Sequence, residues 1–325
     1  MRLLNIKFTE VLIKGKIKTL FIPGTIIYLI AVLLHNTFVR IGWYPLGGAH
    51  PSTNVPFELW GLSEYMKKIL LTMVGCVNGE LAMGAMWFFY TLFFSLCGLS
   101  FTCFITKRIR DRYNLKSISV HGLNLSILTI LALISIVLTN YYGVTIPRVS
   151  NSITMMLPIY LGYYLFNENN VKFNNGWVCC IFSVLYLHSV LLENVEISVP
   201  KNIYQDLFQL VLQGLTSLYV VLYISRLVEK FWLGDILSHI GKKSLYIMAL
   251  HIIGLFIVNS LLECTGLKAP GDARGMYTYL CEENIIIFSL YVVGGLGFPL
   301  LLVYMWDILN KLARTPRFYR TKNAK

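Results

Sequence analysis

Three side chains in or beside long apolar runs could take part in chemistry: Glu80, Trp87 and His251. His251 lies within "SHIGKKSLYIMALHIIGLF" (238–256), roughly 12 Å past Lys243 at the rise of a helix. Ionisable groups inside membrane helices are costly, so each is a functional hypothesis. An imidazole there would handle protons or bind a ligand in a polar cavity. The alternative is a neutral imidazole that hydrogen-bonds a neighbouring helix.

Glu80 and Trp87 flank the entry to another apolar run, in "GELAMGAMWFFYTLFF". Their spacing of seven residues places them on one helical face if the helix begins early. His35 and His188 lie near the ends of other apolar runs. We interpret both as polar tips at a membrane interface.

A polar stripe follows one further apolar segment. Asp206, Gln209, Gln213 and Ser217 are spaced three or four residues apart and so share one helical face. That face could bind the hydroxyls of a sugar-like acceptor. It could equally hold two helices together through hydrogen bonds.

The composition indicates the environment in which these residues lie. The chain has 325 residues, of which 56% are hydrophobic and only 14% charged, against about 25% in an average soluble domain. Its mean hydropathy is +0.63. Several apolar runs approach or exceed about 18 residues with almost no charge, so we predict a multi-pass membrane protein. The net charge of +12 does not indicate a nucleic-acid partner, because the basic residues cluster at the ends of apolar runs.

The predicted fold is an all-α transmembrane bundle with about eight spanning helices, forming a single membrane domain over residues 1–325. We expect these helices at 19–39, 83–106, 119–140, 150–166, 177–193, 205–226, 244–263 and 285–308. The fourth and fifth are short. Between the first two, "LSEYMKKILLTMVGCVNGE" could form an interfacial helix.

The basic residues predict the orientation. With the N-terminus inside, most of the 28 lysines and arginines lie in cytoplasmic segments, as the positive-inside rule requires. Only seven fall elsewhere: Arg40, Lys67, Lys68, Arg148, Lys201, Lys268 and Arg274. Both termini are therefore predicted to be cytoplasmic. The first apolar run lacks a small-residue cleavage site, which favours a retained helix over a signal peptide.

Other chemistries find no support in the sequence. There is no phosphate-binding glycine loop, no HExxH and no GxSxG. The seven cysteines show no zinc-site spacing with histidines. Cys264 and Cys281 bracket one loop and could pair in an oxidising compartment.

Four segments, in order, resemble acyltransferase family three, the integral-membrane O-acyltransferases of bacterial surface sugars. These segments are "KGKIKTLFIPGTIIYLI" (14–30), "GAMWFFYTLFF" (84–94), "MMLPIYLGYYLF" (155–166) and "IGKKSLYIMALH" (240–251). The last is the most specific, and the sugar O-acetylases fit best. The resemblance implies about ten helices, acyl-CoA taken from the cytoplasm and a sugar acceptor. It also implies that Lys14, Lys16 and Lys18 meet the phosphates of CoA, although the same lysines fit plain topology signals.

The chain departs from the family pattern at its start. The family has two helices before the basic stretch, and the first carries an Arg and, about ten residues later, a His held to be essential. Arg110 and His121 mimic that spacing but precede a different helix, so we interpret them as a coincidence. The family's presumed base therefore has no counterpart here. Relative to the family, we expect the chain to be N-terminally incomplete, or else a divergent or inactive member.

Together these observations predict a membrane O-acyltransferase of the bacterial inner membrane. It would transfer acetyl from acetyl-CoA, as co-substrate with no bound cofactor or metal, to a hydroxyl of a surface polysaccharide or exopolysaccharide sugar. The expected site comprises Glu80, Trp87 and His251 for catalysis and Asp206, Gln209 and Gln213 for the acceptor. The alternatives are a catalytically inactive member, a flippase-like polysaccharide transporter or another polysaccharide-processing membrane enzyme.

Overall fold

The computed structural model describes residues 14–44, 46, 56–76, 80–114, 119–146, 148–165, 174–191, 199, 202–204, 206–267 and 285–314. In these residues every regular element of more than one residue is helical, as predicted. The order is η2 (Ile17–Phe21), α2 (Ile22–Arg40), α3 (Leu62–Met73), η3 (Leu81–Met86), α4 (Trp87–Arg112), α5 (Val120–Tyr142), α6 (Val149–Tyr163), α7 (Gly176–Leu191), α8 (Leu207–Val228), α9 (Trp232–Lys242), α10 (Ser244–Cys264) and α11 (Ile285–Arg314).

All eight predicted helices are present, and most of their ends differ from the prediction by a few residues. Among the described residues, six segments are long and apolar enough to cross a membrane: Lys14–Arg40, Ala82–Arg112, Val120–Tyr142, Leu207–Val228, Ser244–Cys264 and Ile285–Leu312. The helix Gly176–Leu191 is apolar but shorter. The protein therefore has the character of a multi-pass membrane protein. The number of spans and the side on which the termini lie stay predictions.

The described residues divide into two compact units. Unit 1 comprises residues up to Ile26 together with Trp87–Asp235, and unit 2 comprises Ile27–Met86 together with the residues from Ile236 onward. Whether the whole chain acts as the single predicted domain stays a prediction.

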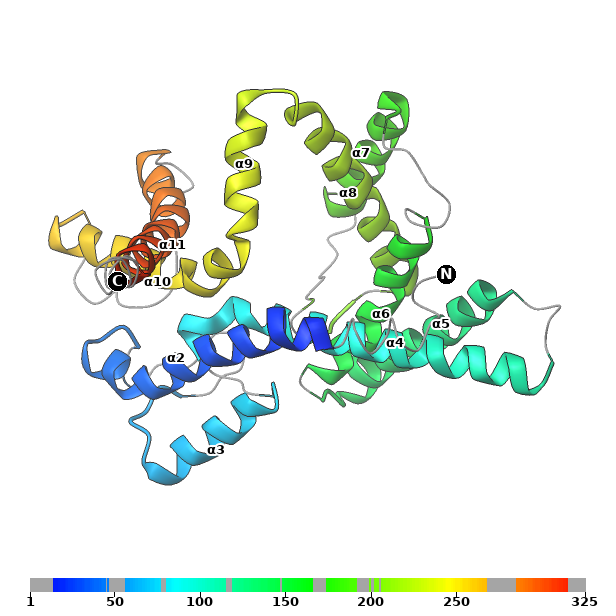
Figure 1. The fold of residues 1–325 in the computed structure, drawn as a ribbon, viewed down its shortest axis with the longest axis horizontal. Coiled ribbons are helices and arrows are strands. Elements are labelled where there is room, and N and C mark those ends of the chain that lie inside the picture. The colour runs from blue at the N-terminus through cyan, green and yellow to red at the C-terminus, as the bar shows by residue number, and fades with distance from the viewer. Residues whose placement is uncertain are drawn as a thin grey trace, which may run out of the picture. The chain divides into compact units, whose positions relative to one another are not determined.

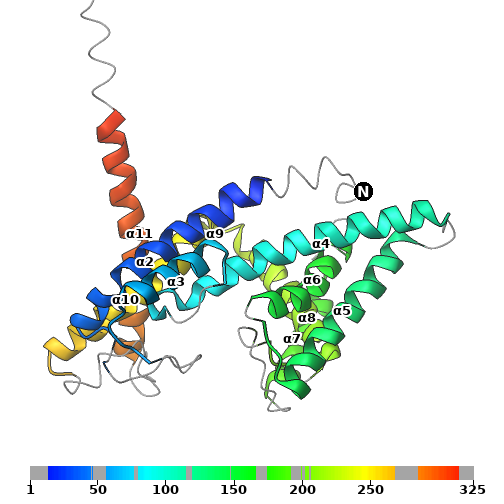
Figure 2. The same cartoon turned by 90° about the horizontal axis from the view of Figure 1, so that it is seen from below.

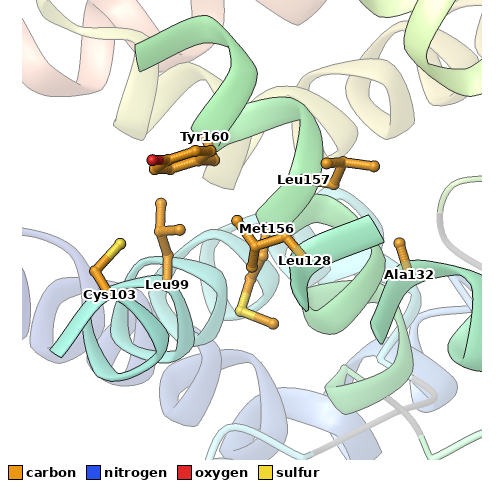
Figure 3. Packing of buried hydrophobic residues seen from close by; sticks show 7 residues of the cluster. All are labelled: Leu99, Cys103, Leu128, Ala132, Met156, Leu157 and Tyr160. Atoms are coloured by element: carbon orange, nitrogen blue, oxygen red, sulfur yellow. The ribbon is translucent and has the colours of Figure 1, made fainter. Parts of the chain in front are cut away.

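Unit 1 is built on α4, α5 and α6, which lie against one another (Figures 1 and 2). Side chains from all three helices converge in one apolar cluster, which Figure 3 shows: Leu99, Cys103, Leu128, Ala132, Met156, Leu157 and Tyr160. Hydroxyls add short hydrogen bonds between helices. Ser95 Oγ, for example, donates to the backbone oxygen of Ser152 at 3.0 Å. Such bonds hold membrane helices together where apolar burial adds little.

Unit 2 is built on α10 and α11, which lie side by side (Figure 1). The two backbones approach so closely that a Cβ added at Gly254 would overlap the carbonyl of Gly294. Tyr291 OH also donates to Asn259 Oδ1 at 2.5 Å. On another side, α10 packs against η3, and a Cβ at Gly84 would lie 3.2 Å from Ile252 Cδ1. Small residues thus set the position of α10, the helix that carries His251.

Candidate functional site

Glu80 lies at the centre of a buried polar cluster in unit 2. It is 1% exposed, and its Oε1 lies 2.8 Å from His35 Nδ1. Its Oε2 accepts a hydrogen bond from Tyr44 OH at 2.9 Å. The Tyr44 oxygen in turn accepts from the backbone N–H of Ala82 at 2.9 Å. The other ring nitrogen of His35, Nε2, lies 3.0 Å from the backbone oxygen of Glu58.

The segment around Trp60 closes the cluster from a second side. The side chain of Asn36 pairs with the backbone of Trp60, donating to its oxygen at 3.0 Å and accepting from its N–H at 2.8 Å. The Trp60 ring stacks on His35 with centroids 3.5 Å apart and 8° between the planes. Lys68 Nζ lies 5.2 Å from the centroid of the Trp60 ring. These contacts fasten the segment 58–68 to the end of α2.

The hydrogen-bond partners determine where the protons of this cluster lie. A backbone carbonyl only accepts, so Nε2 of His35 must carry a hydrogen. A single proton then lies between Nδ1 and Glu80 Oε1, and the pair is neutral overall wherever that proton sits. Burial raises the pKa of Glu80, although its hydrogen bond to His35 acts in the opposite direction. Burial, with the neighbouring Glu80 charge, raises the pKa of Tyr44 far above its usual value. His35 therefore keeps no ring nitrogen for a substrate in this arrangement.

His251 has a different environment. Its Nδ1 lies 3.1 Å from the backbone oxygen of Ile247 and 3.0 Å from that of Met248, both within α10. Since both partners only accept, Nδ1 carries the hydrogen and Nε2 of the neutral ring carries the lone pair. Within the part of the chain that the structure describes, Nε2 has no hydrogen-bond partner. The side chain is partly buried, and the lone pair on Nε2 of the neutral ring is the group that a general base uses.

The three predicted catalytic residues divide between the two units. Glu80 immediately precedes η3, which packs on α10, and Tyr44, which donates to Glu80, also lies near Phe256 of α10, with ring centroids 6.5 Å apart. The structure therefore places Glu80 and His251 on neighbouring elements, without a direct contact. Trp87 is partly buried at the start of α4 and belongs to unit 1.

One residue of the predicted acceptor-binding stripe, Asp206, caps α8. Asp206 is exposed and caps the helix, since its Oδ1 accepts from the backbone N–H of Gln209 at 2.6 Å. The Gln209 side chain is buried and that of Gln213 partly buried. Asp206 thus has a visible structural role, and acceptor binding by the stripe stays a prediction.

The predicted CoA-phosphate lysines lie at the start of the first apolar segment. Lys14 and Lys18 are exposed and Lys16 is partly buried, around the π-helical turn η2. Four residues apart, Lys14 and Lys18 lie near one another on the helix surface and are accessible to an anion. Cys264 is exposed at the end of α10. Its possible partner Cys281 lies outside the described residues.

The sequence interpretation did not assign His35 to the cluster. The predicted interfacial tip at His35 is wrong, because His35 is 1% exposed and paired with Glu80. A usable signal was Glu80 itself, because a carboxylate beside an apolar run needs a buried partner. His121 joins a second contact, with Nδ1 2.9 Å from Tyr160 OH. Among the described residues no three His, Cys, Asp or Glu side chains gather as metal ligands.

Comparison of the chain with protein-family models, with curated proteins and with solved structures gave no match. What the protein does must therefore be argued from its own residues.

Proposed function

We propose that the protein is a membrane O-acyltransferase that transfers acetyl from acetyl-CoA to a hydroxyl of a cell-surface or exopolysaccharide sugar, in a bacterial inner membrane. The observation that carries the proposal is the state of His251. Its Nδ1–H is held by the backbone of α10, which leaves Nε2 as a base inside an apolar helix. The segment most specific to the resembled family, 240–251, ends at this same residue.

The proposed reaction uses this nitrogen as its base. Nε2 of His251 takes the proton of the acceptor hydroxyl as its oxygen attacks the thioester carbonyl carbon. The new C–O bond forms, the C–S bond breaks, and the proton passes to the departing CoA thiolate. A base of this kind contributes typically 10²–10⁴-fold to the rate. The developing oxyanion requires a hydrogen-bond donor nearby. Trp87 stays a predicted catalytic residue of this reaction.

Glu80 has a positioning role in this proposal. It holds His35, Tyr44 and the backbone of Ala82 together, immediately before η3 packs on α10. Loss of this cluster would loosen the packing of η3 and Tyr44 on α10, at Ile252 and Phe256. The lysines at 14, 16 and 18 would meet the phosphates of CoA, and the polar face of Gln209 and Gln213 would meet the sugar.

The test is transfer of labelled acetyl from acetyl-CoA into glycans of membranes that contain the full chain. His251→Gln should lower the transfer rate by about 100-fold or more, because glutamine keeps a donor for the helix carbonyls but provides no base. His188→Gln is the matched control, since His188 is exposed on α7. The control should retain full activity, and both variants should keep the thermal midpoint of the parent in detergent.

Full activity of the His251→Gln variant would remove His251 from the reaction. No transfer by the parent chain itself, with any acyl donor, would contradict the acyltransferase proposal. It would leave the inactive-member and transporter hypotheses.

A further inference from the structure

The helix α9 is amphipathic, because its large apolar side chains and its polar residues lie on opposite faces. At about 100° per residue, its large apolar side chains fall within an arc of about 140°. These are Trp232, Leu233, Ile236, Leu237 and Ile240. The opposite arc carries only small, polar or charged residues: Gly234, Asp235, Ser238, His239, Gly241 and Lys242.

In the part of the chain that the structure describes, the apolar face of α9 is not buried. None of the eleven residues of α9 is buried, and Trp232 is 74% exposed. The helix is also too short to cross a bilayer, since eleven residues span only about 16 Å. A bilayer therefore cannot surround the helix on all sides. Its exposed indole and aliphatic side chains need an apolar surface along one face only.

Both ends of α9 are tied to helices that are long enough to span a membrane. After α8, a tight turn returns the chain, with Phe231 N–H donating to the backbone oxygen of Val228 at 2.9 Å. Gly234 permits this turn, because a Cβ there would lie 2.7 Å from the same oxygen. After α9, only the non-helical Lys243 precedes α10, and the chain changes direction there (Figure 1). Because α9 directly connects two helices of this kind, α8 and α10, it lies at the level of the membrane surface.

We propose that α9 lies in the plane of the bilayer surface as an interfacial helix that binds anionic lipid headgroups. Its apolar face enters the boundary between headgroups and acyl chains, where tryptophan is favoured. Lys230 and Lys242, one at either end of the helix, meet the headgroup phosphates. Asp235, His239 and Ser238 face water. The inference does not depend on the proposed acyl transfer.

The experiment uses the full chain in phosphatidylcholine vesicles, with and without phosphatidylglycerol. Subtracting the fluorescence of a Trp232→Phe variant isolates the Trp232 signal. Brominated acyl chains should quench that signal several-fold more than aqueous iodide does. As a matched control, Ser238→Trp in the Trp232→Phe background places an indole on the opposite face, where the order of quenching should reverse.

Phosphatidylglycerol should increase the quenching of Trp232 by brominated lipid, and the Lys230→Gln, Lys242→Gln double variant should lose that increase. Equal quenching of the two indoles by brominated lipid would overturn the proposal. So would an increase that persists in the double variant. Shielding of Trp232 from iodide without lipid quenching would show a protein partner instead, which also contradicts it.

Discussion

Two histidines of unit 2 differ in the hydrogen bonding of their ring nitrogens. His35, on α2, is 1% exposed and has both ring nitrogens in hydrogen bonds to Glu80 and Glu58. His251, on α10, has Nδ1 hydrogen-bonded to the backbone of its own helix, and its Nε2 has no hydrogen-bond partner among the described residues. Whether one or both ring nitrogens have a hydrogen-bond partner, rather than the depth of the imidazole in an apolar run, thus separates a histidine that fastens the fold from one that can do chemistry.

The largest expected effect on stability comes from breaking the pair at Glu80. Glu80→Ala leaves His35 Nδ1 and Tyr44 OH buried without their partner, which should lower the free energy of unfolding by about 3–5 kcal/mol. Glu80→Gln should cost far less, because its amide can donate to Nδ1 and its oxygen can accept from Tyr44. Thermal and denaturant unfolding of the full chain in detergent would measure both.

A double-mutant cycle checks that the effect belongs to the pair. His35→Ala, Glu80→Ala and the double variant should show a coupling of about 0.5–3 kcal/mol. Additive losses would mean that the two side chains act separately. In contrast, His251→Gln should leave unfolding nearly unchanged while it lowers the rate of transfer by about 100-fold or more.

The helices could be predicted from the sequence because polar residues punctuate long apolar runs. The segment predicted at 119–140 is α5 (Val120–Tyr142), and that predicted at 244–263 is α10 (Ser244–Cys264). The helix α9 was missed because its eleven residues contain no long apolar run and lie among basic residues. Its two-faced pattern was present but short.

The site was harder to predict, for a physical reason. Glu80 stood out because it flanks, with Trp87, the entry to an apolar run, and the structure shows that it is 1% exposed. Its partner His35 lies 45 residues away, across a turn-rich segment whose closure no local rule specifies. The tautomer of His251 likewise depends on the side-chain rotamer that brings Nδ1 to the backbone oxygens of the preceding helical turn. The amino-acid sequence does not specify that rotamer.

The second prediction disturbs the helix that carries His251. Gly254→Ala would force α10 away from α11, since the new Cβ would overlap the Gly294 carbonyl, a backbone group that cannot rotate aside. We expect a loss of about 1–3 kcal/mol in unfolding free energy, with a parallel loss of transfer. Gly214→Ala in α8 is the matched control, because no atom lies within 4 Å of its Cβ position. An unchanged Gly254→Ala protein would show that the two helices are not in close contact.

The third prediction concerns the pH dependence of stability that Glu80 causes. Burial raises the pKa of Glu80 above its ordinary value of 4.5, so the folded protein keeps this proton where the unfolded chain has lost it. The contribution of Glu80 to the free energy of unfolding is therefore complete below the pKa of Glu80 in the unfolded chain. It is lost as the pH rises through the higher pKa of Glu80 in the folded protein. The thermal midpoint of the parent, minus that of Glu80→Gln, should fall from about pH 4.5 upward. A flat difference would contradict the shared proton.

The smallest effect is expected where α10 meets α11 at their charged ends. Lys243 Nζ lies 3.2 Å from Asp307 Oδ2, and the two side chains are 28% and 50% exposed. Water screens such a pair, so Lys243→Gln should cost no more than about 1 kcal/mol of unfolding free energy, decreasing with added salt. Lys242→Gln is the matched control, as Lys242 is the exposed neighbour with no ion pair among the described residues. A loss for Lys243→Gln as large as that for Glu80→Ala would mean that charge at the helix ends, rather than the close glycine crossing, holds α10 in place.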